Sequence, residues 1–242
     1  MNALSEQRKI KSEEEHSHAV RAMFSGIAWR YDLLNHLLSA NIDKRWRRKV
    51  REILTVTLSK ENAKVLDVAC GTGDLSIELS SGARAAVIGT DFCRPMLSVA
   101  QTKNAKIPWI EADALRLSFP DETFDAVTIA FGLRNLASVE SGLNEFHRIL
   151  KTGGQLVILE FSAPVVPGFR KLFDLYFSHV LPRIGGLISG ERDAYEYLPD
   201  SVSKFPDQKA LVELMTESGF QNVTFKNLTG GIAAIHTGQK EP

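Results

Sequence analysis

The sequence is short of cysteine, of net charge and of long apolar runs, and each shortage excludes a class of protein. Its 242 residues include two cysteines, too few for a disulfide framework, so a reducing compartment is expected. Twenty-nine basic residues balance twenty-nine acidic ones, so no overall field attracts nucleic acid. No apolar run reaches the roughly 18 residues of a membrane span, and the polar residues 1–15 lack the apolar core of a signal peptide. These shortages favour a cytoplasmic protein that binds no nucleic acid.

The hydrophobic pattern is typical of an α/β protein. Strand-like and helical patterns alternate, with strands at 64–69, 86–91, 109–113, 124–131 and 155–162 and helices at 74–81, 95–103 and 138–150. This alternation predicts a doubly wound, mostly parallel sheet with a Rossmann-like arrangement. A helix at 207–218 and two strands at 222–228 and 232–238 follow, and the turn Gly230-Gly231 makes those strands a hairpin. We therefore expect seven strands with an antiparallel edge.

The remaining segments divide the chain into one domain and its appendages. Residues 1–15 are expected to be flexible, and residues 16–242 to form a single domain. The domain begins with helical patterns at 16–38 and 44–58. Residues 163–206 are too long for a simple connection between two elements, which indicates a functional insertion.

The glycine loop, residues 69–74, predicts a ligand site. It joins an apolar strand to a helix, and Gly71 and Gly73 let backbone N–H groups approach a ligand closely. A dinucleotide fingerprint needs a third glycine where Ser76 stands, and Asp74 puts a negative charge where a pyrophosphate would rest. A positively charged adenosyl ligand, S-adenosylmethionine, fits Asp67 and Asp74 better.

Acidic residues also follow the next two strands, where ligands of such sheets bind. Asp91 is placed to bond both ribose hydroxyls, and Asp113 to bond the adenine amino group while the Ala114 N–H faces a ring nitrogen. Each carboxylate has an ordinary alternative, because Asp67 and Asp74 suit a cap and a turn, and Asp91 suits a helix cap. Together the strand ends favour the ligand site.

Several segments resemble one family. Asp67–Asp74 is similar to the first motif of class I methyltransferases. The segments that resemble the ubiquinone/menaquinone biosynthesis C-methyltransferases are Tyr31–Asn35 with Ser39 and Trp46, Phe131–Asn135, Arg148–Gly154, Leu159–Ser162, Ala194–Val202 and Phe205-Pro206. The resemblance runs from Met23 to the carboxyl terminus. It implies methylation of an aromatic ring carbon of a polyprenylated quinol precursor, most readily demethylmenaquinol, with residues 16–60 as a helical lid and 163–206 on the substrate side.

The resemblance also implies site residues. Positions that match the family's cofactor contacts are Thr72, Asp91, Asp113 and Ala114, to which the glycine loop adds Asp67, Gly71 and Gly73. Two positions depart from the family pattern. Ala130 replaces a serine that contacts the cofactor in some members, which leaves only a backbone contact, and Asp43 stands where other members have a histidine, so a histidine base is excluded there.

Methyl transfer to an aromatic carbon needs an electron-rich ring, which a phenolate supplies, held in a site without water. The candidates near the reacting atoms are Tyr31, Asp32, Asn35, Arg134 and Asn135. We assign Arg134 to stabilising the phenolate and Asn135 to positioning the ring.

These candidates also have structural interpretations. Arg134 can pair with a carboxylate, Tyr31 can belong to the core, and Asp32 can cap a helix. Glu160 fits either a salt bridge or the substrate cavity, and His147 is expected to be structural. No metal is expected, because His36, His179 and His236 lack ligand spacing with one another and with the cysteines.

Two other segments suggest contact with a membrane surface. A basic run on the predicted helix comprises Lys44, Arg45, Arg47, Arg48, Lys49 and Arg51, and aromatic residues recur through 169–177. Taken alone, the basic run suits a solvated helix face, and the aromatic residues suit a helix face that packs in the core. Together they fit an enzyme that rests on the inner membrane face and admits a prenyl tail.

Other functions remain open. Another class I small-molecule methyltransferase, such as an O-methylating enzyme, is the second hypothesis, and a non-catalytic adenosyl-binding assembly subunit is the third. The sequence does not choose between benzoquinol and naphthoquinol rings, and it leaves the oligomeric state open, with a homodimer among the options.

Overall fold

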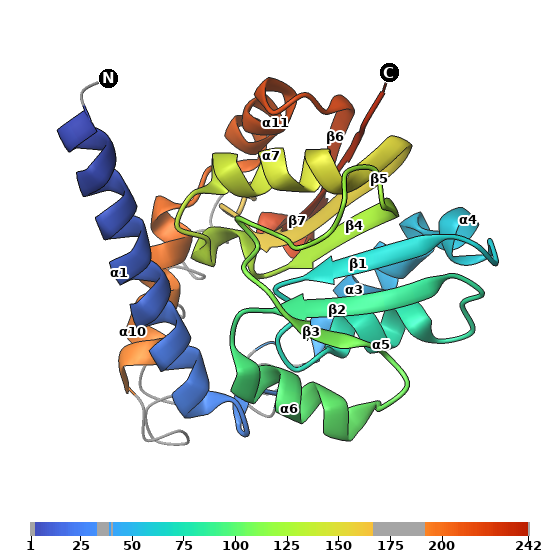
Figure 1. Ribbon diagram of the computed structural model, residues 1–242, viewed down its shortest axis with the longest axis horizontal. Coiled ribbons are helices and arrows are strands. Elements are labelled where there is room, and N and C mark those ends of the chain that lie inside the picture. The colour runs from blue at the N-terminus through green and yellow to red at the C-terminus, as the bar shows by residue number, and fades with distance from the viewer. Residues whose placement is uncertain (1–2, 33–38, 40, 167–191, 242) are drawn as a thin grey trace.

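A seven-stranded sheet with helices on both faces forms the body of the protein in this computed structural model (Figure 1). The structure describes residues 3–32, 39, 41–166 and 192–241. The strand order is β3-β2-β1-β4-β5-β7-β6. The strands are β1 (Lys64–Val68), β2 (Ala86–Asp91), β3 (Trp109–Glu111), β4 (Phe124–Ala130), β5 (Leu150–Phe161), β6 (Gln221–Leu228) and β7 (Ala233–Gln239). The first five run parallel, whereas β7 pairs antiparallel with β5 and β6, so the predicted doubly wound sheet with an antiparallel edge is confirmed.

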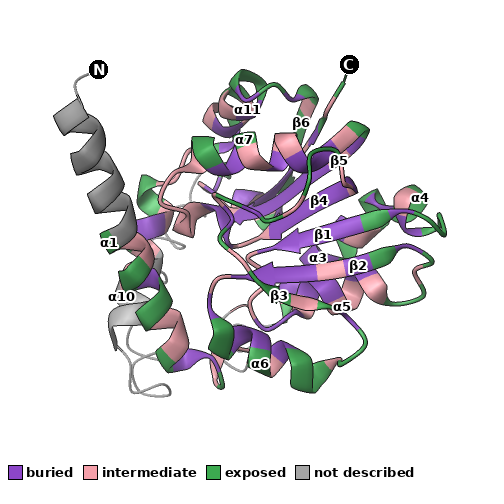
Figure 2. Ribbon diagram, in the orientation of Figure 1, coloured by how far each residue is buried: buried purple, intermediate pink, exposed green. Residues whose placement is uncertain are grey.

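Two apolar layers bury the central strands, which appear purple in Figure 2. On one face, Leu66 and Val68 pack with residues of α7 (Val139–Ile149) and α11 (Gln208–Glu217). On the other face, Val65 packs with α3 (Ile42–Ile53), α4 (Thr55–Leu58) and α5 (Asp74–Ser80). Parallel strands covered on both faces are buried at successive positions, which explains why β1 is buried without a break from Val65 to Val68.

Helix α1 (Ala3–Ile27) lies beside the sheet next to α6 (Arg94–Lys103) and α10 (Arg192–Lys204) (Figure 1). It begins and ends earlier than the predicted helix at 16–38, of which residues 33–38 lie outside the described part. The segment that was expected to be flexible, residues 1–15, therefore has helical backbone from Ala3 onward. Its lysine, glutamate and alanine residues are good helix formers, a property that its polarity conceals.

Two other elements differ clearly from the prediction. The helix predicted at 44–58 is interrupted at the buried Leu54, which separates α3 from α4. Strand β5 begins at Leu150 rather than at 155, because Leu150 already pairs with Phe124. The Gly230-Gly231 turn does join β6 to β7, within the 3₁₀ turn η3 (Thr229–Gly231). Of the predicted insertion, α10 is described and the aromatic segment 169–181 lies outside the described residues.

The basic run of α3 is not one exposed face. Lys44, Arg45, Arg48 and Lys49 are exposed. Arg47 is buried, however, and its guanidinium pairs with Asp43 at 2.5 Å. In the described part of the chain, no helix is both long and apolar enough to cross a bilayer.

Candidate active site

A cavity that is open to solvent at its mouth lies where strands β1 to β4 end. Its sheet side is formed by the segments that follow these strands, including Gly71, Asp91, Asp113, Ala114, Phe131 and Asn135. Ser17, Phe24 and Tyr31, from α1 and the turn after it, line another wall. The cavity therefore lies between the sheet and the N-terminal segment.

The glycine loop adopts a conformation that few residues tolerate. Ala69, Gly71 and Gly73 all have positive φ, at 48°, 55° and 82°. A Cβ on Gly73 would lie 2.4 Å from the Trp109 ring, and that ring is fixed by its Nε1, which donates to the Asn104 carbonyl oxygen at 2.8 Å. Glycine at 73 is therefore required both by the backbone and by the neighbouring ring.

Asp91 is a buried carboxylate at the edge of the cavity. Its Oδ2 accepts a hydrogen bond from the Gly71 N–H at 2.8 Å, and its Oδ1 accepts one from the Cys93 N–H at 2.8 Å. Burial raises the pKa of Asp91 to about 6. Each oxygen has a second lone pair, so the carboxylate can fix the glycine loop and also accept bonds from two hydroxyls of a ligand.

Asp113 and Ala114 line the next part of the cavity, as the sequence predicts. The Asp113 Oδ1 accepts from the Leu115 N–H at 2.9 Å, which holds the turn after β3 in place. Ala114 is buried, whereas Asp113 is exposed. Apolar side chains of Phe92 and Met96 line the same cavity and suit the faces of a planar ring.

Asp67 lies beneath the glycine loop and is not among the residues that line the cavity. It is 1% exposed and accepts hydrogen bonds from Ser76 Oγ at 2.6 Å and Thr128 Oγ1 at 2.9 Å. Burial raises its pKa to about 6. The arrangement suits a residue that supports the loop.

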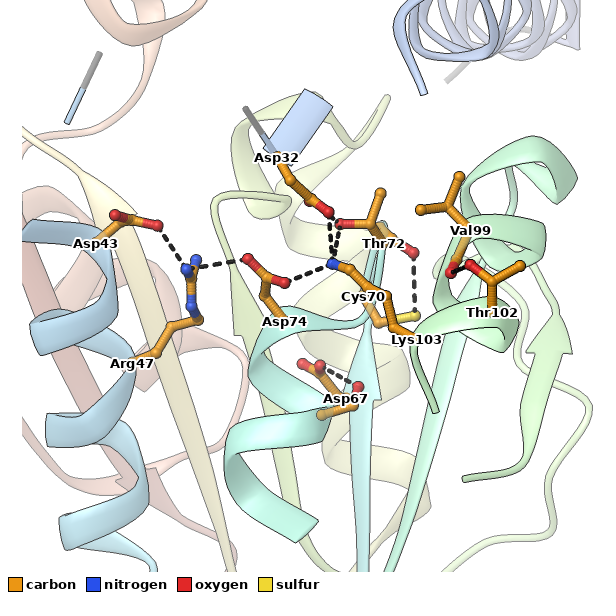
Figure 3. Close-up of polar contacts among 12 residues, drawn as sticks. Asp32, Asp43, Arg47, Asp67, Cys70, Thr72, Asp74, Val99, Thr102 and Lys103 are labelled. Atoms are coloured by element: carbon orange, nitrogen blue, oxygen red, sulfur yellow. Dashed lines mark hydrogen bonds and ion pairs between the residues drawn. The ribbon is translucent and has the colours of Figure 1, made fainter. Parts of the chain in front are cut away.

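An ion-pair network at the outer edge of the glycine loop could not be read from the sequence (Figure 3). The Thr72 hydroxyl donates to Asp32, and Lys103 Nζ lies 2.6 Å from Asp32 Oδ2. Asp74 pairs with Lys103 at 2.5 Å and with Arg47 at 3.0 Å. Asp74 is therefore neutralised by side chains of this protein. Neither Lys103 nor Arg47 lies near Asp74 in the sequence, so no local motif reveals the network.

The loop after β4 is held by two side chains that the sequence singles out. Phe131 has a positive φ of 57°, a strained conformation for a bulky residue. Its carbonyl oxygen accepts bonds from Arg134 Nη1 and, at 3.3 Å, from Asn135 Nδ2. Arg134 also pairs with Glu160 at 2.9 Å, and both side chains are almost fully buried. The sequence left open whether Arg134 pairs with a carboxylate and whether Glu160 forms a salt bridge or faces the substrate cavity. In the structure the two residues form an ion pair with each other.

Asn135 and Tyr31 line the cavity, and Asn135 meets a residue that was not among the predicted site residues. The Tyr197 hydroxyl of α10 donates to Asn135 Oδ1 at 3.2 Å. Burial raises the pKa of Tyr197. Only its place in the motif Ala194–Val202 pointed to this residue.

The model of the ubiE/COQ5 methyltransferase family matches residues 9–240. The chain belongs to this family. It is 49% identical to the demethylmenaquinone methyltransferase of Thermus thermophilus, over 90% of this chain and 100% of that protein. It is 45% identical to the corresponding Deinococcus radiodurans protein, over 96% of both chains. It is 44% identical to a Geobacter ubiquinone/menaquinone biosynthesis C-methyltransferase, over 93% of this chain and 98% of that protein.

Solved methyltransferases share the fold. A methyltransferase of Thermotoga maritima superposes with a TM-score of 0.62 at 16% identity, covering 92% of this chain and all of that one. Phosphoethanolamine N-methyltransferase 2 of Haemonchus contortus, in complex with S-adenosyl-L-methionine, superposes with a TM-score of 0.57 at 14% identity, over 80% of this chain and 53% of that one. The predicted family and fold class are confirmed, and the chain is a methyltransferase of this family.

The cavity fits the donor of this family. A buried carboxylate, Asp91, faces it with lone pairs to spare, which suits a ribose diol. The apolar walls and the polar end at Asp113 suit an adenine ring. The bound donor would supply an electrophilic methyl group on a sulfonium.

No histidine is among the described residues that line this cavity. His147 lies on α7, where its ring meets the edge of Phe220 at 5.1 Å, in agreement with the structural role predicted for it. His236 lies in β7 and contacts the Gln208 carbonyl oxygen at 3.0 Å. The described residues also contain no cluster of three metal-ligating side chains. His36 and His179 lie outside the described residues.

Proposed function

We propose that this enzyme transfers a methyl group from S-adenosylmethionine to a ring carbon of a polyprenylated quinol, with demethylmenaquinol as the preferred acceptor. The observation that carries the proposal is the 49% identity to a demethylmenaquinone methyltransferase over that protein's whole length. The Geobacter relative is named for both ubiquinone and menaquinone biosynthesis, which makes a benzoquinol the second candidate acceptor.

On the donor side, the proposal assigns the ribose hydroxyls to Asp91 and the adenine edge to Asp113 and the Ala114 N–H. The Asp91 carboxylate joins the glycine loop to the second strand through the Gly71 N–H, so donor binding and loop geometry depend on one group. We assign Gly71, Thr72 and Gly73 to the backbone cradle of the donor, and Asp67 to its support from below. Asp67 contacts Ser76 and Thr128, consistent with this supporting role.

On the acceptor side, an aromatic cluster lies behind the cavity. The Phe131 ring lies 4.6 Å from Phe161 and 5.9 Å from Trp46, measured between ring centroids. Phe131 itself lines the cavity. Aromatic walls exclude water and favour a planar ring, and both conditions favour transfer from a sulfonium to a phenolate, in which charge is neutralised.

For ring activation, we propose that Asn135 and Tyr31 contact the acceptor and that Arg134 acts chiefly by positioning. Arg134 fixes the strained Phe131 carbonyl. Burial raises the pKa of Tyr197, whose hydroxyl donates to Asn135, and the positive charge of Arg134 offsets part of that rise. The same charge favours a phenolate in the cavity. Asp32, a catalytic candidate from the sequence, is not among the residues that line the cavity, and we assign it instead to pairing with Lys103.

We also propose that the enzyme works at the cytoplasmic face of a membrane, where a prenylated acceptor resides. The exposed residues Lys44, Arg45, Arg48 and Lys49 support this, since clustered basic side chains are attracted to anionic lipid. The pure protein is expected to sediment with anionic vesicles that carry the quinol. Sedimentation equilibrium would test the homodimer, which remains a proposal without a structural argument.

The decisive experiment incubates the purified protein with labelled donor and each demethylated quinol. The expected product carries the new methyl group on a ring carbon, with demethylmenaquinol turned over faster than the benzoquinol. A methyl group found only on oxygen would assign the protein to the O-methylating class. Donor binding without transfer to either quinol would favour the non-catalytic subunit.

A further inference from the structure

Lys103, the last residue of α6, gathers oxygen atoms from two segments that are far apart in the sequence (Figure 3). Its Nζ lies 2.6 Å from Asp32 Oδ2, 2.5 Å from Asp74 Oδ1 and 3.2 Å from Thr72 Oγ1. Asp32 follows helix α1, whereas Thr72 and Asp74 belong to the glycine loop. One ammonium group thus bridges the N-terminal segment and the loop that cradles the donor.

The bridge matters because the groups it joins would otherwise repel. Asp32 and Asp74 both approach the same Nζ. Without the ammonium the two carboxylates would face one another across a partly buried gap, with Arg47 still paired to Asp74 at 3.0 Å. The Lys103 side chain is 25% exposed. Solvent and salt screen the charges of partly buried groups less than those of fully exposed groups.

The N-terminal segment is also anchored at the other end of α6, by apolar and polar contacts. Ala28 packs with Cys93 and Met96, and Ser25 Oγ lies 3.3 Å from Cys93 Sγ. Lys103 is the charged anchor at the far end of the same helix. Helix α6 therefore holds the N-terminal segment at two points.

Between these points lies Tyr31, which faces the glycine loop. A Cβ on Gly71 would lie 3.8 Å from Tyr31 Cε1, and both residues line the cavity. The position of Tyr31 follows that of its neighbour Asp32, so a contact outside the cavity fixes the wall inside it. Loss of the bridge would open this wall and admit water.

We propose that Lys103 is a positioning residue of the methyl-transfer site, which holds Asp32 and the neighbouring Tyr31 against the glycine loop and so keeps the enzyme in its donor-binding arrangement. The inference deepens the proposed function, because it assigns the residue that assembles this wall. Lys103 acts through Asp32 and Asp74 without touching the cavity.

Donor affinity depends on the fraction of molecules in the competent arrangement. Lys103→Met keeps the length and apolar stem of the side chain and removes only the charge. It is expected to weaken binding of S-adenosylhomocysteine, measured by calorimetry, by about 5- to 20-fold, in line with the loss of partly exposed charged contacts. Hydrogen exchange at the backbone amides of residues 28–32 is expected to accelerate in parallel.

Two matched variants separate this role from general stability. Lys103→Arg retains the charge and is expected to bind S-adenosylhomocysteine within about twofold of the wild type. Lys106→Met removes a lysine from the exposed turn after the same helix and is expected to change neither measurement. If Lys103→Met does not fold, the same two measurements are made on Lys103→Gln, which also removes the charge.

The decisive comparison adds Asp32→Asn. If Lys103 acts by neutralising Asp32, then Lys103→Met should weaken binding less in the Asp32→Asn background than in the wild type. Equal losses in the two backgrounds, or unchanged affinity and exchange in Lys103→Met, would overturn the proposal. None of these measurements uses a quinol, so failure to methylate either quinol overturns the proposed function and leaves this test intact.

Discussion

Replacing Asp91 by asparagine tests the donor site at its most connected residue. The carboxylate accepts bonds from the Gly71 and Cys93 N–H groups and, in the proposed complex, from two ribose hydroxyls. An amide keeps one acceptor oxygen and turns an NH₂ group toward donors. Since a hydrogen bond to a charged group contributes about 1.5–3 kcal/mol, losing one of the two ribose contacts predicts donor binding about 10- to 150-fold weaker.

The ligand-free protein should tolerate the same change. The raised pKa of Asp91 means that the fold disfavours the charged carboxylate, and a shift from 3.8 to about 6 corresponds to about 3 kcal/mol. Removing the charge relieves that cost and offsets the hydrogen bond lost to the backbone. The free energy of unfolding of Asp91→Asn at pH 7 is therefore expected to lie close to that of the wild type.

Calorimetry with S-adenosylhomocysteine between pH 5 and pH 8 gives the readout. In the wild type the affinity should fall as the pH drops below about 6, since a protonated Asp91 accepts fewer bonds. The Asp91→Asn variant should bind weakly throughout and show a much flatter profile. Wild-type affinity in this variant would refute the ribose assignment, and a weak variant that is also strongly destabilised would refute the reasoning from burial.

The other predictions concern the surroundings of the cavity. Arg134→Ala should lower kcat at least about 10²-fold while the donor affinity stays nearly unchanged; an unaltered kcat in a methyl-transfer assay would end that assignment. Gly73→Ala should cost about 2–4 kcal/mol of unfolding free energy in urea, because the methyl group meets the Trp109 ring. Gly153→Ala, at φ 80° in open space, is its control and should cost only the backbone strain of about 1 kcal/mol. Asp67 has a raised folded-state pKa, so its contribution to stability is lost as the pH rises from about 4 to about 6; Asp67→Asn should lack this part of the pH dependence of unfolding, and an unchanged profile would contradict the cause given for the shift.

The sheet could be predicted because its signals are local. Each parallel strand is a short apolar run, and the acidic residue after it marks the edge where ligands bind. Asp91 is the last residue of β2 and Asp113 lies two residues beyond β3, and the structure brings both to one cavity. Helix ends were predicted less accurately than strands. Leu54, for example, interrupts a continuous helical pattern, and no glycine or proline marks the break.

Partners of charged side chains could not be predicted, because they come from distant segments. Arg134 and Glu160 lie 26 positions apart and pair only because adjacent parallel strands bring their ends together. Asp67 and Asp91 both follow the same sequence pattern, yet one is beneath the glycine loop and the other is at the cavity. Asp67 lies within β1, opposite Gly89, whereas Asp91 is two positions further along as the last residue of β2, so only Asp91 reaches the edge where the cavity lies.

The positive φ angles of Ala69 and Phe131 connect the two halves of the site. Both are non-glycine residues in strained conformations, both follow a central strand, and both line the cavity. Such strain persists only where the surroundings fix the backbone. Around Phe131 the fixing groups are Arg134 and Asn135, and around the glycine loop they are Asp91 and the network of Lys103. Arg134 and Lys103 thus help to hold the cavity in shape by positioning, so substitutions at these two residues should alter methyl transfer without removing a contact to the substrate.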